Sequence, residues 1–267
     1  MSTSGFDFKG RRVLVTGASS GIGAVLAEEV ARRGAVVGLV ARRQDRLAET
    51  LERCRVHSPN SKMWVHDLAQ PEAVDDLARS ATAELGGVDV LVNNAGIPKR
   101  RHVTSLDPET VEQVMAVNYL SPVRLTLGLL PSMLERGEGW IVNVSSVAAV
   151  LSSPGEAAYD ASKAALSVFS EAMAIDLWGS GVKVLVVYPG VVDTELFRLP
   201  DNDPIAPGID PIPASEVVEA IVGALERDER QVFVPAYFSD IVAVKTSDLP
   251  GFMAGAAEFV RHSRQAK

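Results

Sequence analysis

The chain has 267 residues, of which 47% are hydrophobic and 22% charged, so it can bury a continuous core without disulfides. Its net charge of −8 argues against a nucleic-acid partner, because phosphate binding requires a basic face. The single cysteine, Cys54, excludes an internal disulfide and is a poor start for a metal site, so we expect no metal. The run Lys99–His102 is the one basic exception, and we expect a solvated loop there.

Short apolar runs alternate with longer stretches of helical periodicity. Strands are predicted at Arg12–Thr16, Val36–Ala41, Met63–His66, Val88–Val92, Trp140–Val144, Val182–Tyr188 and Gln231–Val234. Helices are predicted at Ala24–Arg33, Asp45–Arg55, Pro71–Leu85, Pro108–Arg136, Ala157–Trp178 and Ala214–Arg227. Strands that are apolar on both faces suit a sheet covered on both sides. The sequence therefore predicts an α/β fold of three layers, with a doubly wound, seven-stranded parallel sheet and helices on both faces.

One domain is expected over residues 1–267, because no linker or internal repeat divides the chain. The segment 195–213 is the exception to its regular pattern, and five prolines exclude regular helix or central strand from much of it. These are Pro200, Pro204, Pro207, Pro211 and Pro213. A long irregular loop in a compact domain is usually a functional lid or disordered, and we expect a lid. Without an apolar signal core or a membrane-spanning stretch, the protein is expected to be cytoplasmic.

A glycine-rich turn joins the first strand to the first helix, with Gly17, Gly21 and Gly23 in the pattern G-x-x-x-G-x-G. Glycines let the backbone approach a pyrophosphate, and the helix start offers free N–H groups. The same turn also matches the G-x-S-x-G pattern of serine hydrolases, with Ser19 as the nucleophile. That pattern requires an upstream oxyanion loop and a suitable histidine, which this chain does not offer, so we favour dinucleotide binding.

The second strand ends without the acidic residue that an NAD site uses for the ribose 2′-hydroxyl. Arg42 and Arg43 follow instead, and guanidinium groups bind a 2′-phosphate with charge-assisted hydrogen bonds. We therefore expect NADP(H), with NAD(H) as the alternative. Asp67 after the third strand suits an adenine amino group, and Asn94 after the fourth is expected at the same crevice.

Tyr159 and Lys163 stand four residues apart, on one face of a predicted helix. A neighbouring ammonium is expected to lower the pKa of the phenol, which then serves as a proton donor or acceptor. Ser146, at the end of the fifth strand, offers a hydroxyl to the substrate oxygen as charge develops there. Asn118 lies inside a long helix, where its amide either bonds a backbone carbonyl or positions a water near Lys163.

With these motifs in order, the chain resembles a short-chain dehydrogenase/reductase of the single-domain type with a Rossmann fold. The matching positions are Thr16–Gly23, Asn93–Gly96, Asn118, Ser146, Tyr159, Lys163 and Tyr188–Gly190. The resemblance implies catalytic roles for Ser146, Tyr159, Lys163 and Asn118, with Asn118 completing a proton relay. It implies cofactor contacts from Gly17, Ser19, Ser20, Gly21, Ile22, Arg42, Arg43, Asp67, Leu68, Asn94, Ala95, Gly96, Tyr159, Lys163, Pro189, Gly190, Val192 and Thr194. Ser20 departs from the basic residue that many NADP-dependent members carry there.

The expected function is an oxidoreductase that interconverts a small-molecule carbonyl and an alcohol. Apolar residues of the lid favour an apolar substrate, among them Leu196, Phe197, Leu199, Ile205 and Ile209. The C-terminal extension 236–267 is expected to pack in the core or on another subunit, and the long helices suggest a homodimer or homotetramer. Two alternatives share the fold: a cofactor-binding sensor or scaffold with little turnover, and a dehydratase or epimerase that uses the same tyrosine.

Overall fold

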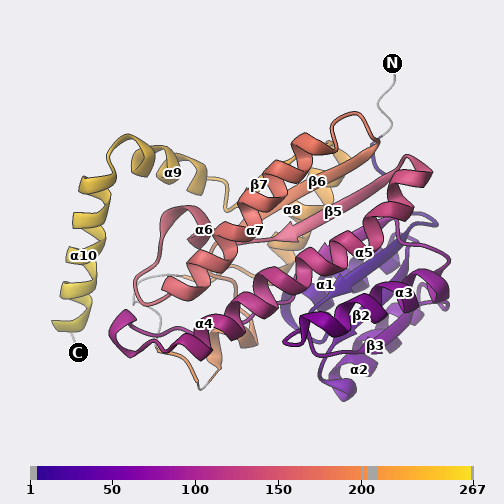
Figure 1. The fold of residues 1–267 in the computed structure, drawn as a ribbon, viewed down its shortest axis with the longest axis horizontal. Coiled ribbons are helices and arrows are strands. Elements are labelled where there is room, and N and C mark those ends of the chain that lie inside the picture. The colour runs from indigo at the N-terminus through magenta and orange to yellow at the C-terminus, as the bar shows by residue number, and fades with distance from the viewer. Residues whose placement is uncertain (1–4, 200, 204–209, 266–267) are drawn as a thin grey trace.

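The computed structural model describes residues 5–199, 201–203 and 210–265. Within these ranges, seven strands form one sheet in the order β3-β2-β1-β4-β5-β6-β7, and all neighbouring strands are parallel. The strands are β1 (Arg12–Thr16), β2 (Val36–Ala41), β3 (Lys62–Val65), β4 (Val90–Asn93), β5 (Gly139–Val144), β6 (Val182–Pro189) and β7 (Gln231–Val234). Helices lie on both faces of the sheet, which confirms the predicted three-layer, doubly wound Rossmann fold (Figure 1).

The helices largely follow the predicted periodicity, with one short helix after β5 and two helices near the C-terminus as additions. They are α1 (Gly21–Arg32), α2 (Gln44–Arg55), α3 (Val74–Leu85), α4 (Pro108–Met115), α5 (Ser121–Arg136), α6 (Ala148–Leu151), α7 (Ala157–Asp176), α8 (Ala214–Glu226), α9 (Phe238–Ser247) and α10 (Leu249–Gln265). The predicted helix Pro108–Arg136 is divided by a π-helical turn at Ala116–Leu120. Gly86 and Gly137 end α3 and α5 in the left-handed conformation, which glycine adopts without steric cost.

Two apolar cores lie on opposite faces of the sheet because successive strand side chains alternate between the faces. Val13 and Val15 of β1 face the core formed with α1, α2 and α8. Leu14, between them, faces the core formed with α3, α5 and α7. The carboxyl ends of the parallel strands all lie along the same side of the sheet. The helices on the two faces leave this side uncovered, and we call it the open edge. The chain reverses its winding between β1 and β4, and ligands of such sheets bind at this switch point.

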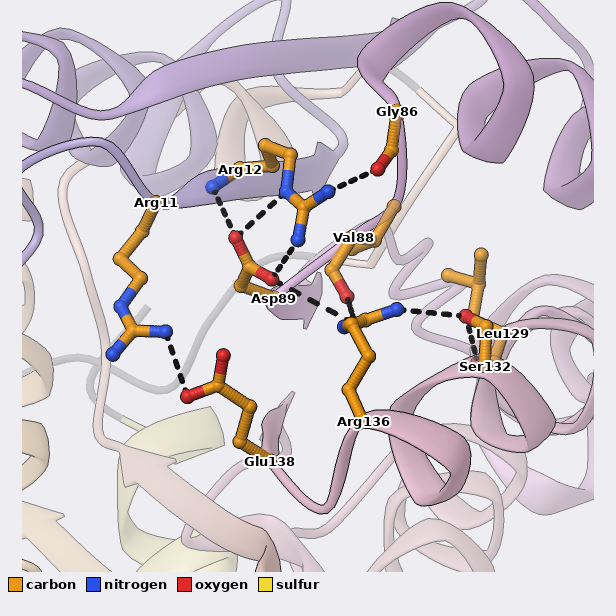
Figure 2. A network of polar contacts seen from close by, with 9 residues as sticks. All are labelled: Arg11, Arg12, Gly86, Val88, Asp89, Leu129, Ser132, Arg136 and Glu138. Carbon is orange, nitrogen blue, oxygen red and sulfur yellow. Dashed lines mark hydrogen bonds and ion pairs between the residues drawn. The ribbon is translucent and has the colours of Figure 1, made fainter.

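The opposite edge, at the amino ends of β1 and β4, is held by a buried carboxylate (Figure 2). Asp89 is 4% exposed and accepts hydrogen bonds from the backbone and the guanidinium of Arg12 at 2.9 and 2.8 Å. Burial alone would raise the pKa of Asp89, but the Arg12 bonds outweigh it and lower the pKa. Arg136 at the end of α5 also approaches Asp89 and donates to the Val88 carbonyl at 2.6 Å. This network ties β1, β4 and α5 together away from the open edge.

One sequence interpretation needs correction. The basic run is not a solvated loop: Arg100 is 4% exposed, and its backbone N–H donates to Asn202 Oδ1 at 2.7 Å. Lys99 and Arg101 both pair with Asp201, so the run holds the lid segment against the rest of the domain.

The C-terminal extension forms α9 and α10, and α10 turns away from the sheet (Figure 1). Met253 of α10 is 62% exposed, and the expected packing of the extension on another subunit stays a prediction. No described helix meets the length and hydropathy of a bilayer span.

Candidate active site

A cavity of about 300 Å³ opens along the carboxyl ends of the strands. Every residue that the sequence predicted to contact a cofactor lines it, as does Ser146, whereas Asn118 lies outside its lining. The cavity is also lined by residues without a predicted role there, namely Ala41, His66, Ile97, Val117, Val144, Ser145 and Glu195. Leu196 and Leu199 of the predicted lid lie on its wall, while Ile205 and Ile209 fall outside the described residues.

The glycine turn brings the backbone of β1 and the start of α1 against this cavity. Gly21 has a φ of +54°, and a Cβ there would come within 2.9 Å of Thr194 Cγ2. A Cβ on Gly23 would lie 2.4 Å from the Gly17 carbonyl oxygen. No side chain caps the N-terminus of α1 and no acidic residue lies in its first turn. The turn therefore offers an uncapped helix start with room for an anion such as a pyrophosphate.

Asn94 fixes the turn to the end of β4. Its Nδ2 donates to the Thr16 carbonyl at 3.0 Å, and its backbone N–H donates to Thr16 Oγ1 at 3.0 Å. The Ala95 N–H donates to the same hydroxyl at 3.1 Å. These bonds satisfy polar groups at the switch between β1 and β4, which are otherwise costly to bury. Asn94 is thus a structural brace of the cavity wall.

The two arginines after β2 differ in their surroundings. Arg43 donates to Ser20 Oγ at 2.7 Å, to Ser19 Oγ at 3.2 Å and to Glu195 at 2.6 Å. The Arg42 side chain is 60% exposed, and its nearest acidic partner is Asp67 at 3.9 Å. Both guanidiniums line the cavity beside the end of β2, where they can bind an anionic group and where we expect the adenosine part of a cofactor.

His66 adds an uncompensated polar atom at the same end. Its Nε2 is buried and has no hydrogen-bond partner among the described residues. Burial lowers the pKa of the imidazole, so the neutral ring is favoured. A buried ring nitrogen without a partner is costly unless a ligand satisfies it. Together with the glycine turn, it indicates a cavity built for a polar ligand, which fits a dinucleotide.

Asn118 occupies the π-helical turn and supports the cavity from behind. Its Oδ1 accepts from the Ile97 N–H at 2.8 Å, and its Nδ2 donates to the Ile97 carbonyl and to Ser162 Oγ, each at 3.0 Å. The side chain is fully buried. Of the two roles predicted for the amide, the structure shows the backbone bond. A π-helical turn of this kind widens a helix locally and frequently occurs at functional sites.

Three of the four predicted catalytic side chains, Ser146, Tyr159 and Lys163, line the same cavity. Ser146 lies close enough to the phenol of Tyr159 to lower its pKa. Ser146 Oγ accepts from the Ala148 N–H at 3.1 Å. Lys163 is 3% exposed and donates through Nζ to the Val144 carbonyl at 2.8 Å. A phenol, a hydroxyl and an amine thus line the cavity together. This combination of groups can carry out acid–base catalysis at a substrate oxygen.

The proton affinities differ from the expectation of a lowered tyrosine pKa. Burial raises the pKa of Tyr159, and the carboxylate of Glu156 raises it further, while the nearby Ser146 opposes both. Burial lowers the pKa of Lys163 to about 8. The expectation was wrong for the cavity as described, because burial dominates and the ammonium is directed to Val144. Tyr159 therefore remains a neutral phenol, which is the form that donates a proton.

Comparisons with known proteins identify the family of this chain. Residues 11–203 match the family model of short chain dehydrogenases. A fatty acyl-CoA reductase of Mycobacterium tuberculosis is 40% identical over 82% of this chain and 74% of its own length. Another fatty acyl-CoA reductase, from Acinetobacter baylyi, is 36% identical over 81% of this chain and 74% of its own length.

Solved structures share this fold. A short-chain dehydrogenase of Sphingobium yanoikuyae in complex with NADPH superposes with a TM-score of 0.79 at 30% identity, covering 91% of this chain and 95% of its own. A relative from Burkholderia phymatum in complex with NAD superposes with a TM-score of 0.83 at 24% identity, covering the same shares, and supports the fold alone.

Proposed function

Because the chain belongs to the short-chain dehydrogenase/reductase family, we propose that it is an NADP(H)-dependent reductase of an apolar carbonyl compound, with Tyr159 as the general acid. Membership makes it an oxidoreductase with a nicotinamide dinucleotide cofactor. The proposed cofactor and the proposed role of Tyr159 rest on the cavity, which is lined by the two arginines and also by Ser146, Tyr159 and Lys163.

The preference for NADP rests on the end of β2. Ala41 is followed by Arg42 and Arg43, and neither an aspartate nor a glutamate of β2 faces the cavity there. A carboxylate in that place would repel a 2′-phosphate, whereas guanidiniums attract it. The NADPH complex of the Sphingobium enzyme is consistent with this preference. The uncapped start of α1 would hold the pyrophosphate, and Asp67 and His66 would lie near the adenine.

The proposed chemistry divides the proton work among three side chains. A bound nicotinamide would supply hydride to the carbonyl carbon or accept it in the reverse direction. Tyr159 would donate its phenolic proton to the carbonyl oxygen, and the Ser146 hydroxyl would hold that oxygen by a hydrogen bond. The ammonium of Lys163 would stabilise the resulting phenolate. Asn118 would keep Ile97 and the π-helical turn in place behind them.

An apolar substrate is favoured by the far wall of the cavity. Leu196 and Leu199 line it together with Ile97 and Val117, and the arginines lie at the adenosine end. The two relatives named above as fatty acyl-CoA reductases suggest an acyl chain. Neither name supports the alternative function of a cofactor-binding sensor or scaffold. We therefore propose fatty aldehydes, fatty acyl thioesters and apolar ketones as the compounds to test first.

We also propose that the chain forms one dehydrogenase domain, with 195–213 as its lid, and that it assembles as a homodimer or homotetramer. Large apolar side chains stay exposed on α5 and α7, including Leu127 (54%), Val168 (65%) and Ile175 (75%). Such residues on long neighbouring helices suit contact with another copy. Analytical ultracentrifugation tests this, since a monomer at all concentrations would contradict it.

The experiment that tests the cofactor proposal is a fluorescence titration of NADPH and NADH on the wild type and on Arg42→Ala. Tighter NADPH binding that is lost in the variant supports the phosphate site. Equal or tighter NADH binding by the wild type contradicts it.

A further inference from the structure

Glu195, the first residue after Thr194, makes a contact that the proposed function does not use. It begins the short 3-10 helix Glu195–Arg198 at the start of the lid and lines the cavity. One carboxylate oxygen accepts from Arg43 Nη1 at 2.6 Å, and the other lies 3.4 Å from Arg46 Nη1. The bond from Arg43 lowers the pKa of Glu195, so its carboxylate is ionised. The carboxylate of Glu195 therefore already binds Nη1 of Arg43.

Arg43 is the point where three segments meet. Its Nη2 donates to Ser20 and Ser19 of the glycine turn, its backbone follows β2, and its Nη1 binds the lid residue Glu195. Carboxylate and phosphate oxygens accept from a guanidinium in the same forked geometry. The Glu195 carboxylate thus takes the kind of contact that a 2′-phosphate would make.

This ion pair is weak enough to exchange. The side chains of Arg43 and Glu195 are 48% and 43% exposed, and exposed pairs contribute little because water screens them. A phosphate carries more charge than a carboxylate and offers three oxygens. An incoming 2′-phosphate can therefore replace Glu195 on Arg43, while a cofactor without that phosphate leaves the pair intact.

We propose that Glu195 is a specificity-determining residue that competes with the cofactor 2′-phosphate for Arg43 and so limits the preference for NADP over NAD. The inference rests on the proposed NADP site and deepens it. It implies that part of the phosphate's binding free energy is spent on displacing Glu195. Removing its charge should therefore strengthen the binding of phosphate-bearing ligands alone.

The test is calorimetric titration with two probes that differ only in the 2′-phosphate, adenosine 2′,5′-bisphosphate and adenosine 5′-monophosphate. In Glu195→Gln, the bisphosphate should bind about threefold to fivefold more tightly than in the wild type, with the monophosphate unchanged. Glu226→Gln is the matched control, because Glu226 pairs with Arg33 at 2.6 Å and is likewise 43% exposed, but lies outside the cavity lining. It should change neither affinity.

Each of the other possible results would overturn part of this proposal. An unchanged bisphosphate affinity in Glu195→Gln overturns the competition, and the NADP site stands if the wild type still prefers the bisphosphate. Equal tightening for both probes also overturns it, because the effect is then independent of the 2′-phosphate. If neither protein distinguishes the probes, both the competition and the NADP preference fail. In an Arg43→Ala background, a persisting effect of Glu195→Gln would place the competition elsewhere and overturn the role of Arg43.

Discussion

The Nζ of Lys163 lies 5.8 Å from the centre of the Tyr159 ring and donates to the Val144 carbonyl at 2.8 Å. The two groups are buried together, and burial favours the uncharged form of each. It raises the pKa of the phenol and lowers the pKa of the amine to about 8. Near neutral pH the pair therefore consists of a neutral phenol and an ammonium, which is the state required to reduce a carbonyl.

The pH dependence of reduction should follow Lys163. Its ammonium is present below about pH 8 and is lost as the pH rises through that value. We expect kcat/KM for carbonyl reduction to fall above about pH 8, because an uncharged amine no longer stabilises the phenolate. The measurement is a pH profile of wild type and Lys163→Met. The residual rate of the variant should lack this fall, and a wild-type profile that stays flat to pH 10 would contradict the assignment.

Asn118 should contribute to stability more than its small size suggests. In Asn118→Ala, the N–H and carbonyl of Ile97 lose their partners, and unpaired groups of this kind are costly. We expect the free energy of unfolding to fall by about 2 to 4 kcal/mol, measured by urea denaturation. Ser162→Ala is the control, because it removes one bond to Asn118 and leaves both Ile97 bonds. An equal loss in the two variants would disprove the role given to Ile97.

Gly21 should be needed for cofactor binding, whereas Gly137 should not. Both have positive φ, +54° and +66°, so alanine strains the backbone at either position. A Cβ on Gly21 also meets Thr194 at 2.9 Å, while nothing lies within 4 Å of one on Gly137. We expect both variants to lose about 1 kcal/mol of stability and only Gly21→Ala to lose NADPH affinity. Comparable affinities in the two titrations would contradict the cavity geometry.

Asp160, beside the catalytic tyrosine, should make stability depend on pH. Burial raises the pKa of its carboxyl from 3.8 to about 7, although the Ser153 N–H bond at 2.6 Å opposes the shift. A raised folded-state pKa gives stability below about pH 4 that is lost as the pH rises to about 7. Asp160→Asn should therefore be more stable than wild type at pH 8, by about 1 to 3 kcal/mol, and nearly equal at pH 4. Thermal melts at both values check this, and a constant difference would refute it.

The sequence was most informative where residue type and position on a strand coincide. Residues at the carboxyl ends of parallel strands meet at one edge, which is why Ser146, Asp67 and Asn94 could be placed before the structure was known. Contacts between distant segments leave no such pattern. Neither the Arg43–Glu195 pair nor the burial of Arg100 under the lid is visible in the spacing of those residues.

The pKa shifts of Tyr159 and Lys163 could not be predicted from the sequence for a related reason. The spacing of Tyr159 and Lys163 shows that they share a helix face, but burial sets the direction of both pKa shifts. The path of the extension after β7 was also difficult to predict, because its apolar residues resemble those of a core segment while Met253 of α10 is exposed.

Tyr159 is proposed to transfer the proton in an NADPH-dependent reduction. The direct measurement is the loss of NADPH absorbance with a fatty aldehyde, a fatty acyl-CoA or an apolar ketone, for wild type, Tyr159→Phe and Tyr119→Phe as a matched control. We predict that Tyr159→Phe still binds NADPH but reduces the substrate about 10²- to 10⁴-fold more slowly, with Tyr119→Phe unaffected. A Tyr159→Phe variant as fast as wild type, or a wild type that binds NADPH and reduces none of these compounds, would contradict the proposed role of Tyr159.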